Sequence, residues 1–295
     1  MTEILTVPEH RKLPVIVMVK RSYGYLWQAR RYLASAGLAM FALNLATGFS
    51  LFSWQISHFP LPGQAREIHF LPILFSLLMI VPGLAFVVGV QRNILCDERR
   101  DGLSFFHFDQ HLRRYILVHV KLAMILFPVM LFLSFVLVMV GAGLGRKYDM
   151  IPEDEALIIL IPFCLAVIGF IWLCTRLSLA LPAAAVGDAK PIAQSWRATR
   201  GAAFRIWAAL ALAALPLLVL MAPANLWLAA SIASIHQIDE TTRVTLSPAS
   251  LLLAEVMVAA VSVVASILFS ATLSYVYAFL VRGNSHQPLA FDPAI

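Results

Sequence analysis

Charged side chains are scarce in this sequence, and their scarcity argues against a soluble protein. Only 13% of the 295 residues are Asp, Glu, Lys or Arg, and 61% are hydrophobic, whereas a typical soluble domain is about 25% charged. Mean hydropathy is correspondingly high, at +0.84. The composition predicts an integral membrane protein.

Cysteine is also rare, with three copies at Cys96, Cys164 and Cys174. An odd number, two of them inside one apolar run, argues against a disulfide framework. No CxxC pair and no Cys/His spacing typical of structural zinc occurs. We therefore interpret the three thiols as small buried side chains and expect no metal and no cofactor.

Three histidines of one predicted cytosolic loop, His107, His111 and His119, are the candidates for metal binding. His107 and His111 are four residues apart and share a helical face, with Asp109 displaced from it. A metal site needs at least three convergent ligands, and no HExxH pattern is present. We expect interfacial histidines beside phosphate groups.

Catalytic patterns are missing as well. The glycines of GAGLG at 141 to 145 do not follow a strand and do not form a nucleotide-binding fingerprint. No acid/base pair or nucleophile set recurs on facing helices. We expect a protein that is not an enzyme.

Long apolar runs are what the sequence has instead. Each can supply the roughly 20 residues that cross a bilayer, and each is too long and too uniformly apolar for a barrel strand. The six runs are 33 to 54, 70 to 90, 122 to 145, 156 to 175, 206 to 235 and 244 to 281. The predicted fold is all-α, a polytopic membrane protein with six transmembrane helices.

Basic residues predict how these helices are oriented. Of the 22 Lys and Arg residues, 18 fall on the side of the membrane that holds the N-terminus. The four on the other side are Arg66, Arg146, Lys147 and Arg243. This asymmetry predicts that both termini are cytosolic. The net charge of +6 then indicates anionic lipids as partners, not nucleic acid.

The chain divides into three parts on this reading. Residues 1–32 are a cytosolic amphipathic arm, 33–281 the transmembrane domain, and 282–295 a cytosolic tail. In the arm, residues 15 to 27 gather apolar and aromatic side chains on one arc, with Arg30 on the apolar side. This pattern predicts a helix lying in the membrane interface. The alternative is an ordinary cytosolic helix packed on a neighbour, which gives the same amphipathic pattern.

A threefold repeat is suggested by similar basic, aromatic sequences before the odd-numbered spans. Arg30, Arg113 and Arg197 lie 83 and 84 residues apart. The spacing predicts three hairpins of two spans, each preceded by an amphipathic cytosolic helix. A central seam between the hairpins would be the place for a lipid or small molecule.

Polar residues in or beside the spans are candidates for lining such a seam. Asn44 lies in the first span, Glu255 near the outer end of the last, and Arg176 at the inner end of the fourth. Asn44 also fits a role as a packing contact between helices, and Glu255 a hydrated or paired interfacial acid.

The basic segment from Arg176 to Arg205 is the most distinctive stretch. Pro182 is expected to end or bend the fourth helix, the Gly-Asp pair at 187 and 188 to form a turn, and Pro191 to begin a new helix. On one helical wheel its cations form a ledge bordered by indoles. The predicted lipid-headgroup residues are Lys190, Arg197, Arg200, Arg205 and Trp196.

This segment resembles a family of bacterial inner-membrane proteins, the YciC-like proteins. They are related to the membrane domain of some glycerophosphodiester phosphodiesterases. The corresponding residues are Arg176, Pro182, Ser195, Trp196, Arg197, Thr199 and Gly201. The resemblance implies a multi-pass protein of the bacterial inner (plasma) membrane, and only thirteen residues follow Arg282, so we expect the phosphodiesterase domain to be absent.

Two functions remain open from the sequence. The first is a non-enzymatic accessory or scaffold module that contacts anionic lipids, with a possible protein partner or a homo-oligomer. The alternative is a transporter of small molecules or lipids that uses the seam between the hairpins.

Overall fold

The computed structural model describes residues 13–57, 70–98, 102–146, 153–235 and 248–283. Within these ranges all regular structure is helical. The elements are α1 (Val15–Ser57), α2 (Phe70–Cys96), the 3₁₀ helix η1 (Gly102–Phe106), α3 (Gln110–Arg146), α4 (Glu153–Leu177), α5 (Ala180–Val186), α6 (Pro191–Ala198), α7 (Ala203–Ile235) and α8 (Pro248–Val281). The predicted all-α class is confirmed.

Five stretches of this bundle are long and apolar enough to cross a bilayer. They are Met79–Cys96, Gln110–Val136, Phe163–Val186, Ala203–Ala222 and Leu252–Val281. The chain is therefore a multi-pass membrane protein by the length and composition of its helices. The predicted first span, 33 to 54, is helical but is not among the five, so the sixth span and the threefold hairpin arrangement stay predictions.

Helix α1 runs without interruption across the expected boundary between arm and span. Its 43 residues contain no proline, so nothing in the sequence forces a break where the hydropathy changes. At 1.5 Å per residue α1 is about 65 Å long, roughly twice the 30 Å hydrocarbon core of a bilayer. The amphipathic segment is thus the first part of one long helix.

The apolar arc of this segment packs on a neighbouring helix. Val19 is buried with Ala209 and Ala213 of α7, and the Tyr23 hydroxyl donates to the Ala213 carbonyl at 2.8 Å. Trp27 stays 71% exposed. Val19 and Tyr23 therefore pack on a neighbouring helix, as the second interpretation of this segment expected. Arg30, expected on the apolar side, is exposed, and its guanidinium carbon lies 4.0 Å from the centre of the Trp27 ring.

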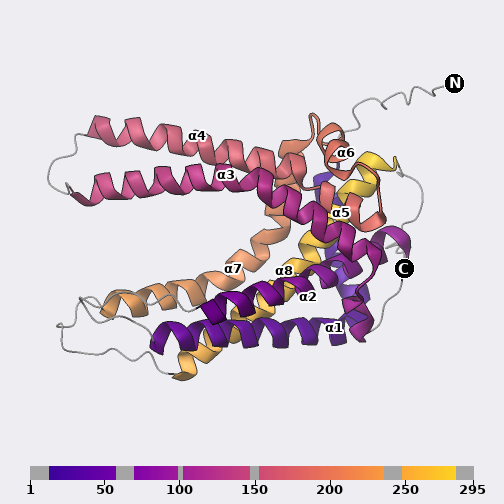
Figure 1. Ribbon diagram of the computed structural model, residues 1–295, viewed down its shortest axis with the longest axis horizontal. Coiled ribbons are helices and arrows are strands. Elements are labelled where there is room, and N and C mark those ends of the chain that lie inside the picture. Colours follow the sequence, from indigo (N-terminus) through magenta and orange to yellow (C-terminus); the bar gives the residue numbers. More distant parts are fainter. Residues whose placement is uncertain (1–12, 58–69, 99–101, 147–152, 236–247, 284–295) are drawn as a thin grey trace.

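Figure 1 shows how the long helices are arranged. Helices α3 and α4 run side by side and diverge from the group formed by α1, α2, α7 and α8. The short helices α5 and α6 lie at the end where the two groups meet. Helix α1 packs most extensively against α8, and the predicted cytosolic connections α5 and α6 form a layer at one end of the bundle.

The core below this end layer is tightly packed around η1. Phe105 of η1 and Phe86 of α2 are fully buried, with ring centroids 6.0 Å apart. Phe105 lies directly over Gly89, where an added Cβ would come within 2.6 Å of its ring. Glycine at this position therefore makes room for the aromatic side chain.

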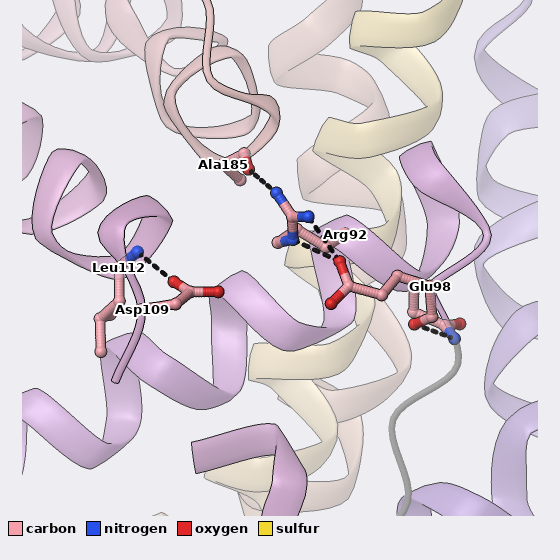
Figure 2. A network of polar contacts seen from close by, with 6 residues as sticks. Arg92, Glu98, Asp109, Leu112 and Ala185 are labelled. Carbon is pink, nitrogen blue, oxygen red and sulfur yellow. Dashed lines mark hydrogen bonds and ion pairs between the residues drawn. The ribbon is translucent and has the colours of Figure 1, made fainter. Parts of the chain in front are cut away.

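Polar contacts tie α2 to its neighbours in the same region. Asn93 Oδ1 accepts hydrogen bonds from the Tyr25 and Tyr32 hydroxyls at 2.9 and 3.1 Å. Arg92 donates to Glu98 Oε2 at 2.6 Å and to the Ala185 carbonyl of α5 at 3.1 Å (Figure 2). These buried and half-buried bonds join α1, α2 and α5.

The basic segment folds largely as its prolines and glycine predict. Helix α4 ends at Leu177, next to Ser178, whose carbonyl the Pro182 ring would meet in a continued helix. Helix α5 ends at Val186 and is capped by Gly187, which has a φ of 90°. The Gly187 and Asp188 amides donate to Ala184 and Ala183, the Schellman arrangement, and α6 begins at Pro191 as expected.

One expectation for this segment was wrong. The helical wheel that grouped Lys190, Arg197 and Arg205 assumed one helix, but α6 ends at Ala198 and α7 begins at Ala203. Gly201, with a φ of 76°, lies in the turn between them. Arg205 consequently lies on a different helix from Arg197.

Candidate functional site

Arg176 occupies the most unusual environment among the predicted site residues. It lies in the last turn of α4 and is only 7% exposed. Its guanidinium carbon is 5.5 Å from the centre of the Trp172 ring and 4.3 Å from that of Trp196. The two indoles meet edge to face at 5.7 Å. The cation is therefore covered by aromatic surface, an arrangement that stabilises its charge.

No carboxylate neutralises this cation within the part of the chain that the structure describes. Its buried Nε has no hydrogen-bond partner there. Arg200, in the turn that follows α6, adds a second positive charge nearby. A buried charge without a counter-ion is costly, so this end of α4 has a strong electrostatic preference for an anion.

The backbone of Arg176 is what holds α6 in place. Ser195 Oγ donates to the Arg176 carbonyl at 2.7 Å, and Thr199 Oγ1 lies 3.2 Å from the same oxygen. Carbonyls in the last turn of a helix lack partners within the helix. The Ser195 hydroxyl satisfies this one and holds Trp196 beside the Arg176 side chain. The Thr199 hydroxyl, just after α6, donates to the Ser195 carbonyl at 2.7 Å.

An apolar groove of about 140 Å³ adjoins this cation. It lies between α4 and the first turns of α7 and is lined by Ile168, Ile171, Trp172, Thr175, Ala203, Phe204 and Trp207. Its one hydroxyl, on Thr175, donates to the Ile171 carbonyl at 2.7 Å, so the lining offers little free polarity. Trp172 borders both the groove and Arg176.

The remaining basic candidates face elsewhere. Lys190 and Arg197 line a hollow of about 370 Å³ between α6 and the end of α8. Lys190 also borders a second hollow of about 600 Å³, where Arg114 and Lys121 of α3 contribute two further cations. The predicted ledge is thus divided, with Lys190 and Arg197 on one side and Arg200 and Trp196 near Arg176. Arg205 is half-buried in the first turn of α7.

The three intramembrane candidates do not share one seam. Asn44 belongs to α1, Glu255 to α8 and Arg176 to α4, and Figure 1 places α4 and α1 at opposite edges of the molecule. The Glu255 carboxylate lies directly against Gly48 of α1, where an added Cβ would overlap its Oε2 atom. Asn44 is one turn from Gly48. Asn44 and Glu255 therefore lie along the α1–α8 contact, apart from Arg176.

The cysteines and histidines do not form a metal centre in the described residues. Cys96 and Cys164 are exposed and Cys174 is half-buried, so the expectation of buried thiols was wrong for the first two. His107 is exposed. Asp109 Oδ1 accepts from the Leu112 amide at 2.8 Å and so caps α3 (Figure 2).

Sequence reasoning missed three residues around these sites. Trp172 is four residues before Arg176, so the pair could have been recognised as neighbours on one helical face. Arg114 and Lys121 meet Lys190 only because α3 packs beside α5. No sequence spacing reports that contact.

Comparisons with known proteins return no match to a family model, a curated protein or a solved structure. The resemblance of the basic segment to the YciC-like proteins therefore stays a prediction.

Proposed function

We propose that this chain is a non-enzymatic accessory or scaffold protein of the membrane, which binds anionic lipid headgroups at the end of the bundle formed by α5 and α6. Membrane localisation rests on the apolar helices. The lipid contact is supported by one observation above all, the cluster of cations around two adjacent hollows.

These hollows combine positive charge with an open surface. Arg114, Lys121, Lys190 and Arg197 line them from three directions. The one acid among the lining residues, Asp188, accepts a hydrogen bond from the Tyr277 hydroxyl. A Lys or Arg close to an anionic membrane surface contributes on the order of 1 kcal/mol. Four such residues would hold this end of the bundle at the headgroups.

The location of the hollows supports the same reading. Residues of α5 and α6 contribute to their lining, and these two helices gather at one end of the bundle (Figure 1). The sequence predicts this end to be cytosolic because it holds most of the basic residues. We therefore propose a bacterial inner-membrane protein related to the YciC-like family, with both termini in the cytosol.

The test is lipid retention by the purified chain. We expect the Lys190→Gln/Arg197→Gln double variant to retain fewer phosphatidylglycerol and cardiolipin molecules in native mass spectrometry than the wild type. The matched control is Arg113→Gln, which removes an exposed charge from α3 that borders neither hollow. Equal retention by the double variant and the wild type would refute the headgroup role.

Transport remains the second candidate function, favoured by one observation. The Glu255 carboxylate is seated against Gly48 between two long helices. Glu255 is half-buried there, and an acid between helices of a membrane protein is a common element of proton and cation pathways. Arg176, one of the three residues on which the transport hypothesis relied, lies apart from this contact. We therefore prefer lipid binding as the function.

A further inference from the structure

We infer that the groove between α4 and α7, together with Arg176 and Arg200, is a binding site for one anionic glycerophospholipid. The phosphate would pair with the two guanidinium groups, and part of one acyl chain would fill the groove. This inference deepens the proposed function and rests on it in one respect, that the chain binds anionic lipid. Its residues are distinct from those of the two basic hollows.

The headgroup end is defined by a charge that lacks a counter-ion. Arg176 is more than nine-tenths buried, and its Nε has no partner in the described residues. The positive charge of Arg200 is close enough to act on the Arg176 charge. Arginine binds phosphate through two parallel N–H donors. A phosphate at this position would supply the negative charge that the surrounding residues do not.

The start of α7 contributes to the same preference. Helix α7 is 33 residues long and begins at Ala203, one of the groove residues. The amides of Arg205 and Ile206 donate to the Ala202 carbonyl, and the helix dipole favours an anion at the amides of Ala203 and Phe204 that precede them. The N-terminus of α7 and the side chain of Arg176 therefore favour negative charge in the same region.

The acyl end is defined by the chemistry and size of the groove. Its lining is apolar, and both helices that form it are long enough to lie in the bilayer. A volume of about 140 Å³ is less than half of the roughly 300 Å³ or more that encloses a whole small molecule. The groove fits a segment of an acyl chain whose remainder continues into the membrane.

The connection between the two ends favours a lipid over a free anion. Trp172 lines the groove and also lies against the Arg176 guanidinium. Thr175, the residue before Arg176, lines the groove as well. A phosphate and a hydrocarbon chain joined in one molecule match this continuous arrangement, whereas inorganic phosphate would use only one end of it.

The experiment measures binding of phosphatidylglycerol to the delipidated full chain in detergent by native mass spectrometry. We expect Arg176→Gln to weaken the tightest binding event by about tenfold or more. Ile168→Trp, which adds a large side chain to the groove, should weaken it similarly without altering charge. The controls are Arg113→Gln and Leu131→Trp, the second at a position on α3 that matches Ile168 in exposure, 55% in each case.

Further arms separate lipid from other anions. Glycerol 3-phosphate and inorganic phosphate, added in excess, should not displace the bound phospholipid, and zwitterionic phosphatidylcholine should bind more weakly than phosphatidylglycerol. Displacement by either free phosphate, or loss of binding in Arg176→Gln but not in Ile168→Trp, would overturn the assignment to a lipid. Unchanged affinity in both variants would overturn the site altogether.

One stability measurement and two further variants make the outcome interpretable. Thermal unfolding of each variant shows whether it is folded, and Arg176→Lys, which keeps the charge but loses the planar group, should bind with intermediate affinity. The Lys190→Gln/Arg197→Gln variant should retain the tight lipid. If that variant loses no lipid while Arg176→Gln does, the basic hollows fail as headgroup sites and the groove site stands.

Discussion

The contact between Gly89 and Phe105 offers a quantitative test of how α2 and η1 pack. A Cβ at Gly89 would lie 2.6 Å from Phe105 Cδ1 and 3.3 Å from Cε1, closer than side-chain carbons approach each other. Phe105 is fully buried against Phe86, so its ring has little freedom to move away. Gly89→Ala should therefore strain the core.

Two opposing effects set the size of the change. Replacing glycine by alanine inside a helix favours the folded state by up to about 1 kcal/mol. Overpacking a well-filled core costs about 1–3 kcal/mol. Gly24 of α1 has no heavy atom within 4 Å of the position of its Cβ, so Gly24→Ala gains the first effect alone. The two variants should differ by about 1–3 kcal/mol in the free energy of unfolding.

The assay is reversible unfolding in mixed micelles, followed by circular dichroism as the denaturing detergent increases. Gly89→Ala should unfold at a lower fraction of denaturing detergent than Gly24→Ala. In a Phe105→Leu background the smaller side chain should relieve the contact, so Gly89→Ala should then cost less, which a double-mutant cycle measures. If Gly89→Ala were as stabilising as Gly24→Ala, the packing described for η1 would be refuted.

Three further predictions concern the ends and the middle of the bundle. Gly187→Ala should destabilise the chain by about 1–2 kcal/mol in the same assay because residue 187 has a left-handed φ of 90°. Burial raises the pKa of Tyr25 above the ordinary value of 10, so the unfolded state ionises first. Stability should accordingly be constant below pH 10 and fall above it, and less steeply in Tyr25→Phe. If the chain is a proton-coupled transporter, Glu255→Gln should abolish flux in proteoliposomes at unchanged expression; unchanged flux would exclude that role.

Hydropathy and helix-breaking residues predicted different parts of this fold with different success. The apolar runs correspond to helices because backbone amides in hydrocarbon must be satisfied within the segment. The arm boundary near residue 32 does not correspond to a helix end, since α1 continues through it. Hydropathy predicts which residues lie in the membrane, whereas prolines and glycines predict where helices end. Helix α1 contains no proline that would end it near residue 32.

The basic segment shows where prediction of the site stopped. Gly187 and Pro191 predicted a turn and a helix start, and both are confirmed. The position of Trp196 over Arg176 could not be predicted, because it depends on α6 packing against the end of α4 through the bond from the Ser195 hydroxyl to the Arg176 carbonyl. The local sequence predicts where a turn lies, but it does not predict which helix the chain packs against after that turn.

The bond from Ser195 to the Arg176 carbonyl has a consequence for movement of α6. Leaving a carbonyl at the end of a membrane helix without a hydrogen-bond donor costs about several kcal/mol of free energy in a water-poor region. If α6 moved away from α4, this carbonyl would lose the Ser195 hydroxyl that donates to it. The end of α4 thus holds α6 in place, and with it the positions of Lys190 and Arg197 at the two ends of that helix.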